Sequence, residues 1–126
     1  MTAVSDLFKV VNYEYYKNYS FSAAGIASTP EDLNLFFQKL YTTNTLISRE
    51  SFTYMSTFND DDYGMGLQRY KYKYIYLYGH GGDNISFKLR NYYNPLNNNI
   101  LIIASNRFGD MYMDKITNAI LSAYGF

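Results

Sequence analysis

The chain has 126 residues, of which 48% are hydrophobic and 17% are charged, and its formal net charge is +0. This length and composition exclude a disordered chain and predict one globular domain, residues 1–126, with a single core. A neutral chain lacks the charge that attracts nucleic acid or an anionic membrane, so we expect neither as a partner.

Residues 1–22 are rich in tyrosine and show no clear period, so we expect an irregular lead-in. A helix is predicted from Pro30, because Thr29 can cap it and proline suits its first position. Glu31 and Asp32 favour the positive end of that helix. Apolar residues then recur on one face: Leu33, Phe36, Phe37 and Leu40. A second helix is predicted from Ser48, where the flanking residues have the spacing of a hydrophobic staple.

The second half of the chain is mostly strand-like. Residues 63–70 form one candidate strand and residues 72–78 a second, with the connecting turn expected within residues 68–73. Ile85, Phe87 and Leu89 line one face of a third candidate strand. After a turn at residues 94–99, residues 100–104 form a continuous apolar run, which is typical of a central strand buried on both faces.

A last helix is expected from about Asp110 to Tyr124, with Gly125 as its stop. Its apolar stripe is predicted to contain Met113, Ile116, Ile120 and Tyr124. The sequence therefore predicts an α+β fold: an antiparallel meander of about four strands, two helices before it, and a C-terminal helix packed on the sheet.

Several kinds of site and partner are disfavoured by the sequence. No apolar run approaches the roughly 18 residues of a membrane span, so we expect no membrane segment. Residues 1–11 lack the basic and apolar regions of a signal peptide. The absence of cysteine excludes disulfides and thiolate metal sites. The acidic run at residues 59–62 lacks the spacing of a calcium loop and indicates a solvated turn. The compartment stays open, and no cofactor is indicated.

Four short motifs occur in a specific order. They are AAGIASTPEDL at residues 23–33, YGMGL at residues 63–67, GHGG at residues 79–82 followed by Phe87, and IIASNR at residues 102–107. Together they resemble the C-terminal part of the serine β-lactamase and penicillin-binding-protein-like family, which includes class C β-lactamases, DD-peptidases and related esterases. The resemblance covers about residues 20–124 and implies a partial β-lactamase/transpeptidase-like fold.

The resemblance also implies an active-site wall at residues 79–82. His80 takes the place of the lysine in the family's Lys-Thr-Gly motif and would steer the substrate or the nucleophile network. Gly81 and Gly82 would let the backbone approach the substrate, with Asn84 beside them. The backbone N–H of Asp83 would be one oxyanion-hole donor. We expect His80 and Asp83 to lie at the edge of a groove, although a histidine among glycines is also typical of a turn.

The family's nucleophile motif is missing. Ser-x-x-Lys needs a serine three residues before a lysine, and none of the lysines in this chain has one. Tyr-x-Asn occurs at residues 16–18 and 92–94, in the wrong place for the family both times. The sequence therefore predicts the C-terminal segment of a larger serine hydrolase, inactive alone. The intact parent would act on a β-lactam, peptide or ester, and such parents are usually extracytoplasmic.

Two other functions stay open: a binding module that holds a peptide or partner chain without turnover, and a tyrosine-rich domain that associates with itself. In the resembling family the N-terminal segment supplies strands to the same sheet. We therefore expect an unpaired sheet edge here, with the Tyr72–Tyr78 face as part of it. The expected partner is a second copy of the chain or the missing N-terminal segment.

Overall fold

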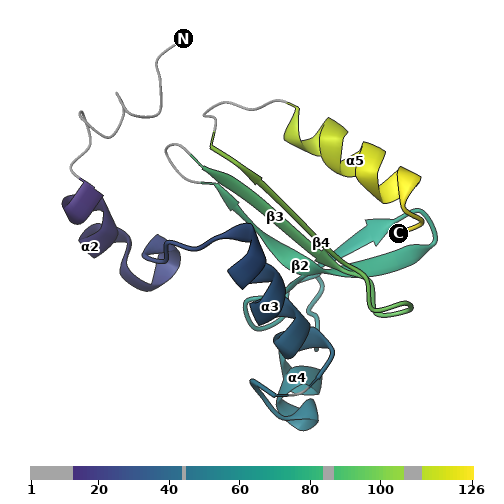
Figure 1. Ribbon diagram of the computed structural model, residues 1–126. Coiled ribbons are helices and arrows are strands. Elements are labelled where there is room, and N and C mark those ends of the chain that lie inside the picture. Colours follow the sequence, from purple (N-terminus) through teal and green to yellow (C-terminus); the bar gives the residue numbers. More distant parts are fainter. Residues whose placement is uncertain (1–12, 44, 84–86, 107–111) are drawn as a thin grey trace.

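The computed structural model describes residues 13–43, 45–83, 87–106 and 112–126. Its elements are, in chain order, α2 (Tyr13–Ala24), α3 (Pro30–Tyr41), α4 (Arg49–Met55), β1 (Gln68–Tyr72), β2 (Ile75–Asp83), β3 (Lys88–Tyr93), β4 (Ile100–Ser105) and α5 (Met113–Ala123). The four strands form one antiparallel sheet in the order β1-β2-β3-β4. α3 and α5 lie on opposite faces of this sheet (Figure 1). The predicted α+β fold is confirmed.

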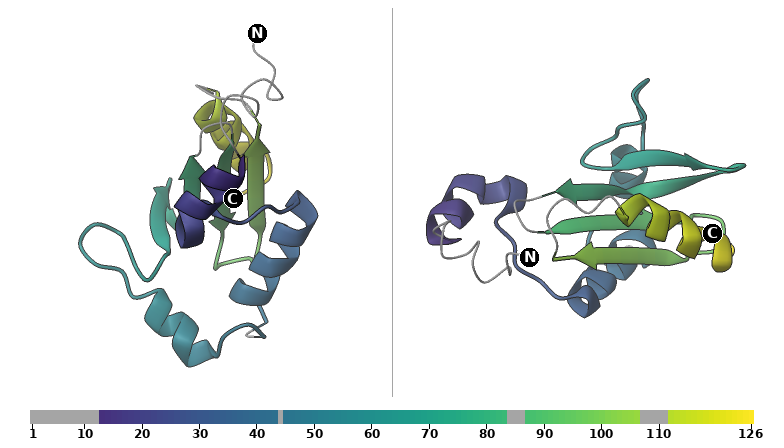
Figure 2. Two further views of the ribbon diagram at one scale, coloured as in Figure 1. Left: turned by 90° about the vertical axis from the view of Figure 1, so that its left-hand side faces the viewer. Right: turned by 90° about the horizontal axis from the view of Figure 1, so that it is seen from above.

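The sequence missed α2. The irregular lead-in expected for residues 1–22 is wrong from Tyr13 onward, where the chain is helical, and residues 1–12 lie outside the described residues. Phe21 interrupts this helix with a φ of 39° and is 81% exposed. Figure 2 shows α2 at one end of the molecule, joined to α3 by an extended segment. A helix that packs few side chains on the sheet needs no apolar stripe, so its sequence shows no helical period.

The two predicted helices before the sheet are confirmed, together with their caps. The Thr29 hydroxyl accepts from the Asp32 backbone N–H at 3.2 Å, and Pro30 occupies the first turn of α3. The Ser48 hydroxyl accepts from the Ser51 backbone N–H at 3.1 Å at the start of α4. These caps fix where both helices begin, because they satisfy backbone donors that the helix leaves without a partner.

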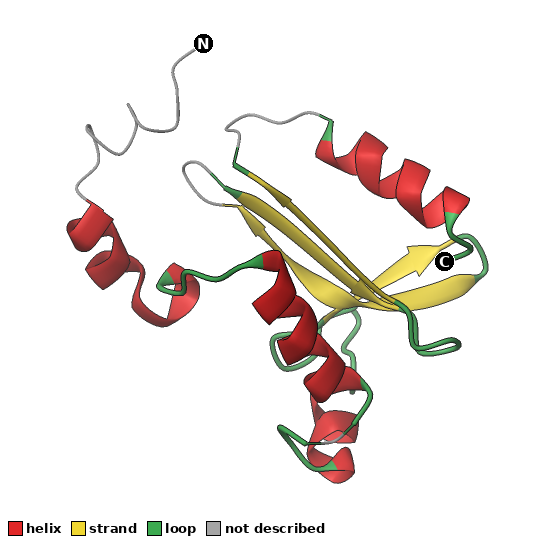
Figure 3. Cartoon of the chain, viewed as in Figure 1, coloured by secondary structure: helices red, strands yellow, loops and turns green. Residues whose placement is uncertain are grey.

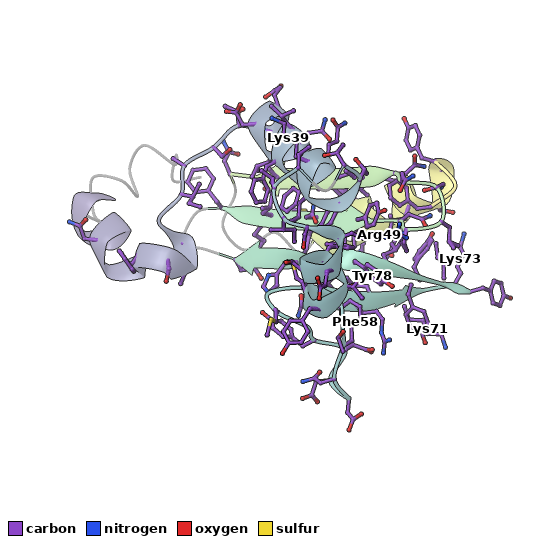
Figure 4. The ribbon with its side chains drawn as sticks, turned by 90° about the horizontal axis from the view of Figure 1, so that it is seen from below. Lys39, Arg49, Phe58, Lys71, Lys73 and Tyr78 are labelled. Carbon is purple, nitrogen blue, oxygen red and sulfur yellow. The ribbon has the colours of Figure 1, made fainter. Side chains whose placement is uncertain are left out.

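The main core lies between the sheet and the α3 and α4 helices. We call this side of the sheet the α3 face. Tyr41 of α3 stacks on Tyr93 of β3 with ring centroids 4.7 Å apart, and Phe37 stacks on Tyr41 at 5.5 Å. Tyr78 lies directly opposite Tyr93 in the β2–β3 pairing and packs against Phe58, as Figure 4 shows. This core therefore combines stacked aromatic rings with buried aliphatic side chains such as Leu40 and Leu67.

The opposite side, the α5 face, holds a second set of buried side chains. Strand alternation places Leu77 of β2 on this face, where it has no exposed surface. Met113, Thr117 and Leu121 are the buried positions of α5. The predicted stripe is therefore wrong in part, because Ile116 and Tyr124 are 45% and 74% exposed. None of the described helices is long and apolar enough to cross a membrane.

Four strand boundaries differ from the prediction. The first hairpin turns at Lys73 and Tyr74, inside the run read as one strand: Tyr72 pairs with Ile75, and Lys73 has a φ of 52°. Two-residue hairpin turns usually contain glycine or asparagine, and this one contains neither. The tyrosine alternation continues across it, so the sequence does not indicate a turn there. Residues 63–67 form a turn closed by a single bridge from Tyr63 to Gln68 instead of a strand.

The other two differences concern β3 and β4. β3 runs from Lys88 to Tyr93 and so continues past the predicted Leu89, and Ile85 lies outside the described residues. β4 runs one residue beyond the predicted run, to Ser105, and the expectation of a central strand buried on both faces is wrong, because β4 is the last strand of the described sheet and its residues are only half-buried or exposed. The expected turn after β3 is present: the Asn98 backbone N–H donates to the Asn94 carbonyl oxygen, and the Asn94 N–H donates to the Asn99 carbonyl oxygen. Figure 3 shows the sheet and its connecting turns.

Candidate functional site

The GHGG motif lies within β2 and not in a turn. β1 begins at Gln68, which pairs with Gly79, so β1 does not extend along the rest of β2. β2 continues to Asp83, and residues 80–83 stay paired with β3. Within the described parts of the chain, residues 80–83 therefore have a neighbouring strand on one side only. We call this exposed side the β2 edge.

His80 is exposed on the α3 face and is held by two contacts. Its Nδ1 lies 2.5 Å from the carbonyl oxygen of Gly81, and its Nε2 lies 3.1 Å from the hydroxyl of Tyr63. A carbonyl oxygen only accepts hydrogen bonds, so Nδ1 of the neutral ring carries the proton. Nε2 then accepts from the Tyr63 hydroxyl, and the two rings meet edge to face with centroids 5.8 Å apart.

This contact joins two of the sequence motifs. Tyr63 is the first residue of the YGMGL motif, one of the four motifs of the resemblance, for which the sequence predicts a strand. The hydrogen bond shows that the motif positions a side chain against His80. Sequence spacing could not indicate it, because the two residues are 17 positions apart and are brought together by the turn that precedes β1.

The glycines of the motif differ in their surroundings. A Cβ on Gly79 would lie 1.9 Å from the backbone oxygen of Asn91, so the pairing of β2 with β3 requires glycine there. A Cβ on Gly81 would lie 3.1 Å from the Arg90 guanidinium, and one on Gly82 would meet nothing closer than 3.9 Å. Open space for an approaching ligand is therefore greatest at Gly82.

A buried polar pair lies behind His80. Asn91 is directly opposite His80 in the strand pairing, is 1% exposed, and accepts from the Tyr41 hydroxyl at 2.8 Å through Oδ1. Its Nδ2 is buried and has no hydrogen-bond partner within the described residues. Burial, helped by the nearby Tyr70 and Tyr93 hydroxyls, raises the pKa of Tyr41 well above its usual range. Tyr41 therefore remains a neutral donor to Asn91.

Asp83 contributes a side chain and a backbone group to different sides of the strand. Its carboxylate pairs with the Arg90 guanidinium at 3.0 and 3.3 Å. The hydrogen bond from Arg90 has the largest effect on the pKa of Asp83 and lowers it; burial raises this pKa by less, and the charges of Arg90 and Lys88 lower it further. This carboxylate is thus ionised and occupied, which leaves only the backbone N–H for the predicted oxyanion role.

The direction of that N–H follows from the strand. Gln68 of β1 pairs with Gly79 of β2, and the Arg69 backbone N–H donates to the Asp62 carbonyl oxygen at 2.8 Å, on the side of β1 away from β2. Backbone groups alternate in direction along a strand, so those of Gln68 point toward Gly79 and those of Gly79 point toward β1. Backbone groups of residues two apart point to the same side of a strand, so the Asp83 N–H points toward the β2 edge.

The remaining predicted site features are not placed by the structure. Asn84 lies outside the described residues. Among the hollows on the described part of the chain are one of about 510 Å³ between α4 and Met65, and one of about 410 Å³ around Phe21 and Ile26. Neither is lined by His80 or Asp83, and the groove beside them stays a prediction. No cluster of three metal-ligating side chains is found in the described ranges.

Comparison with known proteins gives no match: no protein-family model fits the chain, and no curated protein is similar in sequence. The resemblance to the β-lactamase-like family therefore rests on the four motifs alone.

Proposed function

We propose that this chain is the C-terminal segment of a serine hydrolase of the β-lactamase and penicillin-binding-protein-like type, inactive alone. It would keep the His-x-Gly wall of the active site and lack the Ser-x-x-Lys nucleophile. The observation that supports this most is the β2 edge, where a glycine-rich strand end carries His80 and no described strand pairs with its outer side. Such an edge suits an acyl substrate, whose carbonyl needs close backbone donors.

Each group has a role that its chemistry allows. The Asp83 N–H, which points to the β2 edge, would donate to the oxyanion that forms on the attacked carbonyl. Gly82, with open space beside it, would let the substrate lie close to the strand. The Tyr63 hydroxyl holds His80 in one orientation, so that the ring borders the substrate. The nucleophile and its base would come from another segment of the parent.

The test is acylation of the isolated chain. Loss of a serine nucleophile costs roughly 10⁶-fold in rate in a well-studied serine protease. We expect no stoichiometric covalent adduct with a fluorescent penicillin and no turnover of a chromogenic cephalosporin. A stable adduct on one serine would contradict the proposal, because it would show that a nucleophile is present.

A second candidate function is a binding module for an extended peptide. The same β2 edge favours it, because a peptide can add to an exposed strand through backbone hydrogen bonds alone. Tyr63 on the α3 face and Tyr70 on the α5 face flank the edge and could contact alternate side chains of such a peptide. A module of this kind would bind linear peptides and would show no preference for a β-lactam ring.

A further inference from the structure

β4 has the apolar composition of an interior strand, but it lies at the edge of the sheet. Residues 100–104 read Ile-Leu-Ile-Ile-Ala, so both faces of the strand are apolar. Of these residues, four are only half-buried and Ala104 is exposed. The only described strand that pairs with β4 is β3. Among the described residues, β4 is therefore an uncharged apolar strand with one open side, which is a template for a further strand.

The opposite edge of the sheet is different. β1 carries Arg69 and Lys71, and Lys73 follows in the hairpin turn, where Figure 4 shows Lys71 and Lys73 at the margin of the sheet. Charged side chains on an edge strand oppose pairing with another chain. The Arg69 guanidinium also forms an ion pair with the carboxylate of Asp62, with a nitrogen–oxygen distance of 2.5 Å. Asp62 belongs to the segment that precedes β1. The two edges of one sheet are thus built unlike each other, and only β4 is free of charge.

We propose that β4 pairs antiparallel with β4 of a second copy of this chain, which joins the two sheets into one. A second copy fits because identical uncharged strands do not repel, and the whole chain has a formal net charge of +0. The helices on both faces of the sheet also expose apolar side chains. α3, which packs on β4, exposes Leu35 and Phe36 by 51% and 49%, and α5 exposes Ile116 by 45%.

The alternation of side chains fixes the register of this pairing. A two-fold axis perpendicular to the sheet keeps the α3 face of one copy continuous with that of the other, so paired residues must share a face. Centring the axis on Ile102 pairs that residue with itself and Ile100 with Ala104. This is the only centre that pairs residues 100–104 entirely with one another. Moving the axis to Ile103 would place Leu101 opposite the polar Ser105.

This pairing replaces the Tyr72–Tyr78 face as the expected association surface. That face does not exist as one strand, because the chain turns at Lys73 and Tyr74. Leu77 is fully buried, and Tyr74, which is completely exposed, sits at the tip of the hairpin. The β4 pairing is independent of the proposed role of the β2 edge, which lies on the other side of β3.

Single cysteines test the proposal, because the natural chain has none. In the Ile102→Cys variant the two thiols would face each other across the axis, within reach of a disulfide. In Ala104→Cys the two thiols would be four residues apart along the strands, about 13 Å, which is too far to bridge. Lys71→Cys places the thiol on β1 as a control for collisions at the other edge.

We expect mild oxidation with diamide to convert most of the Ile102→Cys variant to a disulfide-linked dimer, with no more than background dimer for the other two. Circular dichroism before oxidation checks that each variant is folded. If Ile102→Cys does not fold, sedimentation velocity of the unmodified chain decides, with a dimer expected at micromolar concentration and a shift toward monomer in Ala104→Lys. A monomeric unmodified chain, or equal cross-linking of all three variants, would overturn the proposal.

Discussion

The Tyr63 hydroxyl lies 3.1 Å from Nε2 of His80, while Nδ1 of the same ring lies 2.5 Å from the Gly81 carbonyl oxygen. These two contacts require the neutral ring to carry its proton on Nδ1. Long-range ¹⁵N–¹H correlation spectra of the chain at alkaline pH should show this tautomer. In Tyr63→Phe the Nε2 contact is lost, so we expect a mixture of tautomers. Finding the Nε2–H tautomer in the unmodified chain would show that the hydrogen-bond arrangement is wrong.

The glycines of β2 should differ in their tolerance of alanine. Gly79→Ala would place a Cβ 1.9 Å from the Asn91 backbone oxygen, and the strands would have to separate. We expect this variant to lose about 3 kcal/mol of unfolding free energy, which is typical of severe overpacking. Gly82→Ala meets nothing closer than 3.9 Å and should stay within about 1 kcal/mol. Urea unfolding of both variants measures the difference, and equal losses would argue against the tight β2–β3 approach.

The sequence predicted the order of the elements better than their edges. Thr29 and Ser48 are capping residues whose chemistry acts over three or four positions, so both helix starts were predictable. The turn at Lys73 and Tyr74 was not, because neither residue is a usual turn former and the tyrosine alternation continues across it. α2 has no apolar stripe to reveal it.

The candidate site was predictable only in part. The sequence singled out His80 through its glycine neighbours, but the structure adds Tyr63 and the buried Asn91, which lie 17 and 11 positions away. Their proximity depends on strand register and on the turn before β1, which no local pattern encodes. The role of Gly79 was likewise hidden, because it concerns the backbone of β3.

The buried hydrogen bond from Tyr41 to Asn91 should contribute to stability. Tyr41→Phe keeps the ring stacked on Tyr93 but leaves Oδ1 of a buried amide without this donor. We expect a loss of about 1–3 kcal/mol, the cost of a buried polar group without a partner. Tyr54→Phe is the matched control, because Tyr54 is 67% exposed and should change stability by less than about 0.5 kcal/mol. A harmless Tyr41→Phe would indicate that Asn91 has another donor.

The stability of the chain should fall in alkali. Burial raises the pKa of Tyr70 from 10.0 to about 12 in the folded chain. The hydroxyl ionises more easily when the chain unfolds, so its contribution is complete below pH 10 and is lost as the pH rises toward 12. Urea midpoints measured between pH 8 and pH 11.5 should therefore decline above pH 10. The decline should be shallower in Tyr70→Phe, and an unchanged slope would contradict the effect of burial on this residue.

The proposed function is tested most directly by asking where an acyl substrate contacts the chain. We would titrate ¹⁵N-labelled protein with benzylpenicillin and, separately, with a peptide ending in D-alanyl-D-alanine, and record the intact mass of each sample. We expect weak, reversible amide shifts centred on His80, Gly82 and Asp83, with no increase in mass. Shifts for the linear peptide alone would favour the binding module. A covalent mass increase, or shifts that leave the β2 edge unchanged with both ligands, would contradict the proposed function.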